Sequence, residues 1–396
     1  MLLSAGGLTW SALSPDDGSG DFEVTIPAGT AAVADAGAAA LALQDLQRAV
    51  SEGDVSLAQE VAVDSSGPQS LLAALVTNAE LAQITDVQLR YVDEIGAVTP
   101  DGRWSAAVAV QWRYDGFDRA PASTETTVAF VSDDEGTHIA GIGGETLRTP
   151  VWMSGPLSVS RTSDYLLLVS DTADLARYAR LTERAVRVVS EVVVGWDGRL
   201  VVEVPRDAHG LERALGVEPG FYQQIAAVTG SADGSVSATA PIHVYVNPEV
   251  FDGLGPRGQE VVLDHEAAHV AGEGPLSRAP AWLIEGYADY VALRDSTLPL
   301  TKTAAQIRDQ VRADGPPMSL PGPAEFDTRG THLGAVYESA WLACRVLAER
   351  GGDAAFLDFY ERVSDGEAVG PALQSLFGWS EADLISAWTS RLESLP

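Results

Sequence analysis

The sequence predicts an α+β protein in which a domain of helices and a curved antiparallel sheet precedes a second domain of strands and helices. Three observations support this class. Two helical stretches come before three extended stretches in residues 26–150, strands accompany a long helix after that point, and the C-terminal part has helical patterns. With 396 residues, the chain is also too long for one small domain.

The composition excludes several classes of function. Hydrophobic residues make up 46% of the chain and charged residues 20%, which is enough to bury a substantial core. The net charge is −31, from 25 Lys and Arg against 56 Asp and Glu. We therefore expect no nucleic-acid partner, because such a partner needs clustered positive charge. Cys344 is the single cysteine, so any metal would be held by histidines and carboxylates.

Residues 1–25 form an apolar segment that we expect to be flexible. Its start, "MLLSAGGLTWSAL", has no preceding Lys or Arg and is a poor signal peptide as it stands. It could instead be the remainder of a membrane anchor, although no run in the chain reaches the length of a membrane-spanning helix. The sequence leaves both alternatives open.

Residues 26–150 are expected to form the first domain. Leu43, Leu46 and Val50 follow helical spacing, and "PQSLLAALVTNAEL" is a second helical stretch. The extended stretches "ITDVQLRYVDE", "RWSAAVAVQWRYDGF" and "STETTVAFVSDD" are rich in β-branched and aromatic residues and are separated by turn sequences. In the order of its elements, this domain resembles the cone-shaped fold of nuclear-transport-factor-like domains.

Residues 151–396 are expected to form the second domain. "DYLLLVSD" predicts a buried strand, and "TADLARYARLTERAVRVVSEVVV" predicts a long helix that begins at a Thr/Asp-rich cap. Further strands are predicted in "RLVVEVP", "QQIAAVTGS" and "PIHVYVNPEVF". Helices then follow to the end of the chain.

The first of these helices, in "GPRGQEVVLDHEAAHVAGEGP", carries a pattern typical of a metal site. His265 and His269 are four residues apart, slightly more than one helical turn, so both imidazoles point the same way and can bind one cation. Glu266 lies beside them and can take a proton from a metal-activated water that attacks a carbonyl. This is the HExxH arrangement. The alternative is an ordinary helix with hydrogen-bonded histidines.

A second helix, in "APAWLIEGYADYVAL", supplies the remaining groups. Glu285 would complete a set of two histidines and one carboxylate and would leave a fourth position for water, as a catalytic zinc requires. Asp289, one turn later, is placed to accept a hydrogen bond from the far nitrogen of a ligand histidine. The alternative is a solvated acidic face, which the joint occurrence of the two motifs makes a weak explanation.

The pair "HEAAH" and "WLIEGYADY" resembles the gluzincin zinc peptidases, the thermolysin- and aminopeptidase-related group called peptidase MA-like. The resemblance implies a zincin-type metallopeptidase domain over residues 151–396 and one Zn²⁺ per chain. His265, His269 and Glu285 would be the zinc ligands, Glu266 the general base, and Asp289 the partner of a ligand histidine. The separation of His269 and Glu285 is at the short end for gluzincins.

Two residues are candidates for stabilising the oxyanion of the reaction. Tyr337, in the helical stretch "GTHLGAVYESAWLACRVLAER", is the first choice because the family's downstream helix often carries a tyrosine. His332 is the second. The alternative for Tyr337 is packing, since an apolar stripe lies beside it.

The strand "PIHVYVNPEVF" lies just before the motif helix. The resemblance implies that this strand is the sheet edge on which an extended peptide substrate lies. Pro241 and Pro248 would keep it from being a fully paired central strand. His243 alternates with apolar residues and is expected to face outward.

The sequence therefore favours a zinc metallopeptidase with a peptide or protein substrate. One alternative is a zinc-binding but inactive relative that acts as a binding or scaffold protein of the cell envelope, and another is a binding protein without metal. The partner of the N-terminal domain is unknown. The resemblance and the apolar start favour an extracytoplasmic location, secreted or membrane-anchored, over a cytoplasmic one.

Overall fold

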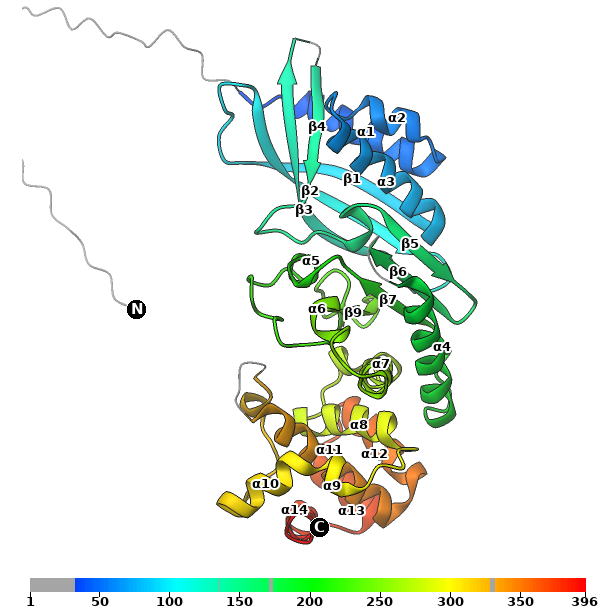
Figure 1. The fold of residues 1–396 in the computed structure, drawn as a ribbon, viewed down its shortest axis with the longest axis vertical. Helices are drawn as coiled ribbons and strands as arrows, with labels where there is room; N and C mark the ends of the chain where they lie inside the picture. The colour runs from blue at the N-terminus through cyan, green and yellow to red at the C-terminus, as the bar shows by residue number, and fades with distance from the viewer. Residues whose placement is uncertain (1–32, 135, 171–173, 328–331) are drawn as a thin grey trace, which may run out of the picture.

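A computed structural model describes residues 33–134, 136–170, 174–327 and 332–396 (Figure 1). The predicted apolar segment 1–25 lies outside the described residues. Within these ranges no helix is both long and apolar enough to cross a lipid bilayer. The predicted α+β class is confirmed: helices and an antiparallel sheet come first, a second sheet lies in the middle of the molecule, and the C-terminal part is helical (Figure 1).

The first sheet is an antiparallel meander covered by three helices. Asp35 caps the first helix by accepting a hydrogen bond from the backbone of Ala38, and the apolar stripe of this helix is buried. Fully or almost fully buried aromatic side chains, including Trp104 and Trp112, point inward from the strands. The strand at residues 136–142 was not predicted. The elements are α1 (Ala36–Glu52), α2 (Val55–Glu60), α3 (Ser66–Ala82), β1 (Ile84–Ile95), β2 (Arg103–Tyr114), β3 (Ala122–Asp133) and β4 (Gly136–Ile142).

The second sheet has five strands in the order β5-β6-β7-β9-β8. Helix α4 (Leu175–Val192) connects the parallel strands β6 and β7, whereas β5 and β8 are antiparallel to their neighbours at the two edges. The helix α5 (Ala208–Leu215) lies between β7 and β8 in the chain. The strands are β5 (Leu157–Arg161), β6 (Tyr165–Ser170), β7 (Leu200–Val204), β8 (Ala227–Ser231) and β9 (Ile242–Val246).

Both faces of the second sheet are buried. Leu167 and Val202 pack into the core shared with the C-terminal helices, while Leu166 and Val201 pack into the core of the first 150 residues. A strand covered on both faces reads as a continuous apolar run, which explains "YLLLVS" and "LVVEV". The two predicted domains therefore share a buried interface, and the exact boundary at residue 150 stays a prediction.

The predicted role of β9 as an edge strand is wrong. Its residue Val244 pairs with Val202 of β7 on one side and with Thr229 of β8 on the other. Pro241 and Pro248 stand just before and just after the strand, so neither removes a hydrogen bond from the ladder. The edge strand beside the motif helix is β8.

The remaining chain forms the helical part. Helix α8 lies between α7 and α11, and its Gly286 allows close approach because a Cβ atom there would lie 2.5 Å from the backbone oxygen of Ala340. The helices are α6 (Pro248–Phe251), α7 (Pro256–Ala271), α8 (Ala281–Leu293), α9 (Leu300–Thr303), α10 (Ala305–Asp314), α11 (Leu333–Gly351), α12 (Asp353–Ser364), α13 (Val369–Phe377) and α14 (Glu381–Glu393).

Candidate metal centre and active site

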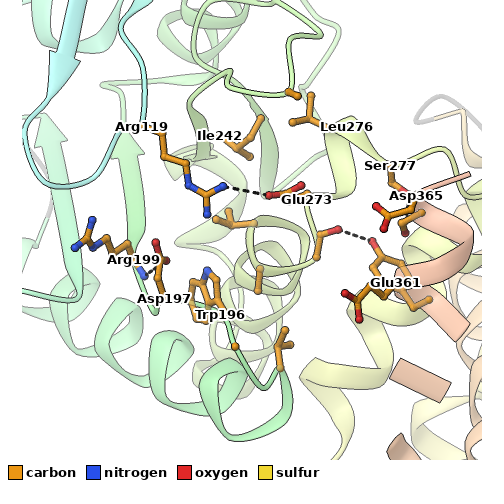
Figure 2. A pocket seen from close by; sticks show the side chains of 18 of the residues that line it. Arg119, Trp196, Asp197, Arg199, Ile242, Glu273, Leu276, Ser277, Glu361 and Asp365 are labelled. Atoms are coloured by element: carbon orange, nitrogen blue, oxygen red, sulfur yellow. Dashed lines mark hydrogen bonds and ion pairs between the residues drawn. The ribbon is translucent and has the colours of Figure 1, made fainter. Parts of the chain in front are cut away.

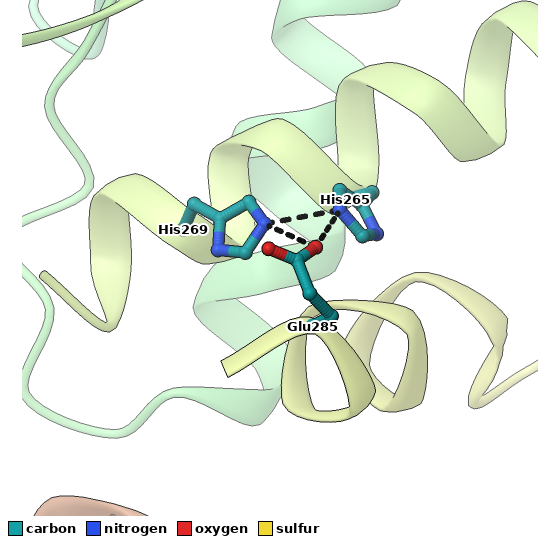
Figure 3. Close-up of side chains that lie close together, drawn as sticks. All are labelled: His265, His269 and Glu285. Atoms are coloured by element: carbon teal, nitrogen blue, oxygen red, sulfur yellow. Dashed lines mark hydrogen bonds and ion pairs between the residues drawn. The ribbon is translucent and has the colours of Figure 1, made fainter. Parts of the chain in front are cut away.

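Helices α7 and α8 bring the three candidate ligands together. His265 and His269 project from one side of α7, and Glu285 reaches toward both from α8 (Figure 3). The two Nε2 atoms lie 3.0 Å apart, and Glu285 Oε2 lies 3.4 Å from that of His265 and 3.3 Å from that of His269. Two imidazole nitrogens and one carboxylate oxygen are a donor set that suits zinc.

Asp289 orients one of the two histidines. Its Oδ1 lies 2.8 Å from Nδ1 of His265. A proton on Nδ1 leaves the lone pair of Nε2 directed at the other two candidate ligands, and the hydrogen bond fixes the orientation of the ring. Asp289 stands one helical turn after Glu285, so a single helix supplies both carboxylates.

The carboxylates favour a positive charge at this point of the molecule. Burial lowers the pKa of His265, but Asp289, Glu285 and Glu266 outweigh burial and raise this pKa well above its ordinary value. Burial raises the pKa of Glu285, but His269 and His265 outweigh burial and lower it well below its ordinary value. A cation, whether a proton or a metal ion, is therefore stabilised between these side chains.

The candidate base Glu266 points to the edge strand of the second sheet. The residue is 7% exposed, and the hydroxyl of Thr229 in β8 donates a hydrogen bond to its Oε2 at 2.7 Å. Sequence reasoning missed Thr229. A threonine in a predicted strand has no distinguishing local pattern, and the contact joins residues 37 positions apart.

Tyr337 lies beside the histidines, whereas His332 does not. The ring centroid of Tyr337 is 6.0 Å from that of His265, and the ring of Phe326 lies perpendicular to it with 5.4 Å between the centroids. Burial and the charges of Glu285 and Glu266 raise the pKa of Tyr337 well above 10, so its hydroxyl keeps its proton as a donor. His332 is exposed at the start of α11, and in the described residues no hydrogen bond or ring contact joins it to the candidate ligands.

Two further contacts hold α7 and its end in place. Asp264, next to His265, is fully buried and forms an ion pair with Arg184 of α4. Burial raises the pKa of Asp264 to about 6, although Arg184 opposes this shift. After the helix, Gly274 lies so close to His269 that a Cβ atom there would be 2.8 Å from its Nδ1. A side chain at this glycine would displace a candidate ligand.

A cavity of about 800 Å³ lies at the C-terminal end of α7 (Figure 2). Arg119 from the turn after β2 and Glu273 point toward each other across it, with 3.6 Å between their charged atoms. Trp196 and acidic residues of α12 form other parts of its wall. Neither the candidate ligands nor Glu266 line this cavity, so it is distinct from the candidate metal centre.

No protein-family profile and no curated protein sequence matches the chain. Solved structures that match the chain include an M1 zinc metallopeptidase from Deinococcus radiodurans, in a mutant form bound to a Tyr-Ser-Ala substrate, with a TM-score of 0.38 and 15% identity over 73% of this chain. A mutant of the M1 zinc metallopeptidase from the same organism has a TM-score of 0.35 and 15% identity over 73% of this chain. A two-domain M1 zinc metallopeptidase mutant bound to L-arginine has a TM-score of 0.35 and 15% identity over 67% of this chain. This chain spans 61%, 62% and 60% of those chains.

Proposed function

We propose that this protein is a zinc-dependent peptidase that hydrolyses peptide bonds. One zinc ion per chain would be held by His265, His269 and Glu285. The observation that carries the proposal is that the donor atoms of these three side chains all lie within 4.8 Å of one another, and Glu266 directly follows His265 in α7. When bound, zinc acts as a Lewis acid that polarises a carbonyl and lowers the pKa of water.

Each surrounding side chain has a defined task in this proposal. Glu266 takes the proton of the attacking water and passes it to the nitrogen of the leaving amine. Tyr337 donates a hydrogen bond to the oxygen that becomes negative during the attack. Asp289 keeps His265 in the required orientation through its 2.8 Å contact.

The substrate would lie extended along β8. In the described residues β8 pairs with β9 on one side only, and Thr229 of this strand touches Glu266. A peptide that adds to the free edge of β8 would therefore run next to the general base. This replaces β9 as the strand expected to bind the peptide backbone.

The first test is zinc per chain, measured by elemental analysis of the parent protein and of Glu285→Ala. We expect about one equivalent in the parent and a large loss in the variant, because two histidines alone hold zinc weakly. Glu393→Ala, at the exposed end of α14, is the matched control and keeps its zinc. A parent that binds no zinc when zinc is supplied contradicts the proposal.

Turnover separates a peptidase from an inactive zinc-binding scaffold. Peptide libraries are incubated with the zinc-loaded parent and with Glu266→Gln, and products are identified by mass spectrometry. Cleavage by the parent that the variant lacks, at equal zinc content, supports the peptidase. Full zinc without cleavage of any peptide in the library would favour the scaffold.

A further inference from the structure

Thr229 holds one specific oxygen of Glu266. Its Oγ1 lies 2.7 Å from Oε2 of Glu266 and 3.0 Å from the backbone oxygen of the same residue. Within the described ranges, no other hydrogen bond reaches this carboxylate. Oε1 has no hydrogen-bond partner among the described residues, and it is not fully buried, so it keeps some contact with solvent. The two oxygens of the carboxylate therefore have different surroundings.

Strand pairing fixes the position of this hydroxyl. Thr229 is the middle residue of β8 and stands opposite Val244, with paired residues on both sides of it. Val244 is buried in the core that contains Leu263 and Ala267 of α7. Because the side chains of directly paired residues on neighbouring antiparallel strands lie on the same face of the sheet, Thr229 faces α7 as Val244 does.

We propose that Thr229 is the positioning residue of Glu266: its hydroxyl holds Oε2, so that Oε1 is the oxygen that takes the proton of the attacking water. This inference rests on the proposed peptidase function. In this step an O–H bond of water breaks and one forms on Oε1, while the water oxygen bonds to the carbonyl carbon and the π electron pair of the C=O bond moves onto its oxygen. The proton then moves to the amine nitrogen as the C=O bond re-forms and the C–N bond breaks.

The same strand would also locate the substrate. β8 is an edge strand, so a peptide that pairs with it takes its position from the backbone that carries Thr229. Thr229 then fixes the base relative to that backbone. Since a misplacement of about 1 Å can cost about 100-fold in rate, the contact bears directly on the chemical step.

Thr229→Val and Thr229→Ser separate positioning from packing. Valine has nearly the shape of threonine and suits a strand, but it lacks the hydroxyl, whereas serine keeps the hydroxyl. We expect kcat to fall about 10- to 100-fold in the valine variant, with KM changed less than about 2-fold. The serine variant should recover kcat to within about 3-fold of the parent. Thr126→Val, at a buried threonine of β3 whose hydroxyl has no partner in the described residues, is the control.

Zinc content, measured in the same samples, separates failure of this inference from failure of the proposed function. A valine variant that retains zinc and has the kcat of the parent overturns the positioning role. A valine variant that loses zinc or unfolds, while the serine variant does the same, also overturns it, because the threonine is then structural.

Crystal structures of the parent and both variants test the contact even if no peptide is cleaved. We expect the Glu266 carboxylate in one conformation in the parent and in the serine variant, and displaced or in several conformations in the valine variant. An unchanged carboxylate in the valine variant overturns the inference. If the parent cleaves no peptide but the Glu266 carboxylate is displaced in the valine variant, the positioning contact is supported and the proposed peptidase function is contradicted.

Discussion

At the scale of single residues, the hydrogen bond between Asp289 and His265 fixes the orientation of one candidate ligand of the proposed metal centre. Without it, the imidazole is free to rotate and to place its proton on either nitrogen. Because the carboxylate also contributes negative charge, its loss weakens the binding of a cation in two ways.

We therefore expect Asp289→Ala to weaken zinc binding by about 10- to 100-fold. Asp289→Asn keeps an acceptor oxygen without the charge, so its loss should be smaller. Competition with a chromogenic chelator measures both affinities. Equal affinities in the parent and in Asp289→Ala would show that the histidine is oriented by other contacts.

His243 shows how a single residue differs from its predicted role. It was expected to face outward, but it is fully buried between Asp118 and Glu203, at 2.9 and 2.7 Å from its two ring nitrogens. Two carboxylate partners require both nitrogens to donate, which makes the ring an imidazolium. Asp118 belongs to the turn after β2, so this contact joins the first sheet to the second.

The stability of the protein should fall as the pH rises toward 10. Burial lowers the pKa of His243, but Asp118 and Glu203 raise it to about 10, against 6.5 for the unperturbed group. The ion pairs of His243 thus contribute fully to the free energy of unfolding below about pH 6.5, and this contribution is lost as the pH rises through about 10. Tyr114 and Tyr245 also pack on the ring, and burial holds their pKa values well above 10, so they remain neutral in this range.

Chemical denaturation at pH steps from 7 to 10 checks this expectation. The free energy of unfolding of the parent should fall more steeply than that of His243→Gln. The variant should be about 3–5 kcal/mol less stable at pH 7, because two buried carboxylates then face each other without a cation. His209→Gln, at a partly exposed histidine, is the control. If the free energies of unfolding of the parent and of His243→Gln fall in parallel with pH, the assignment of a charged His243 is contradicted.

At the scale of elements, the packing of α8 against α11 determines where Glu285 lies. Gly286 follows this glutamate directly, and a Cβ atom there would be 2.5 Å from the Ala340 oxygen and 2.6 Å from the Cys344 sulfur. The backbone oxygen cannot move aside as a flexible side chain can. A larger residue must therefore shift the whole helix, and Glu285 with it.

Gly286→Ala should lower both zinc affinity and the melting temperature, although alanine is the better helix former. Gly67→Ala in α3 is the matched control, because nothing lies within 4 Å of the added atom. There we expect a gain of about 0.4–1 kcal/mol in stability. Isothermal titration with zinc and thermal unfolding measure the two effects. Unchanged zinc affinity in Gly286→Ala would mean that the two helices move apart without moving the ligand.

At the scale of the whole molecule, the second sheet depends on the first 150 residues. Leu166 and Leu168 are fully buried, and Val201 and Tyr245 nearly so, in the core that they share with α1–α3 and the first sheet. A fragment of residues 151–396 would expose this apolar face to water. Residues 33–150 would then stabilise the part of the chain that carries the candidate metal centre.

We expect the fragment 151–396, produced alone, to aggregate or to lose cooperative unfolding. Production together with residues 33–150 should restore a folded complex. Size-exclusion chromatography and thermal unfolding by circular dichroism measure this. A monomeric fragment that unfolds cooperatively at the temperature of the full chain would show that the two domains are independent.

The sequence by itself determined the helices that carry the candidate site. A spacing of four residues sets His265 and His269 on one side of α7, and the same spacing links Glu285 and Asp289 on α8. These relations follow from helical geometry, which acts between near neighbours in the chain. They could therefore be predicted without knowing the fold, although their role in binding zinc stays a prediction.

Only the tertiary structure decided which strand lies at the edge and what surrounds Glu266 and His243. The order β7-β9-β8 results from pairing between separate segments of the chain. The alternation of apolar and polar residues along one strand does not indicate which strands will pair with it. Thr229 meets Glu266 because helix α7 packs against β8, and Asp118 meets His243 across 125 positions because the two sheets pack together. Such contacts arise from long-range burial of apolar surface, so they appear only once the whole chain is folded.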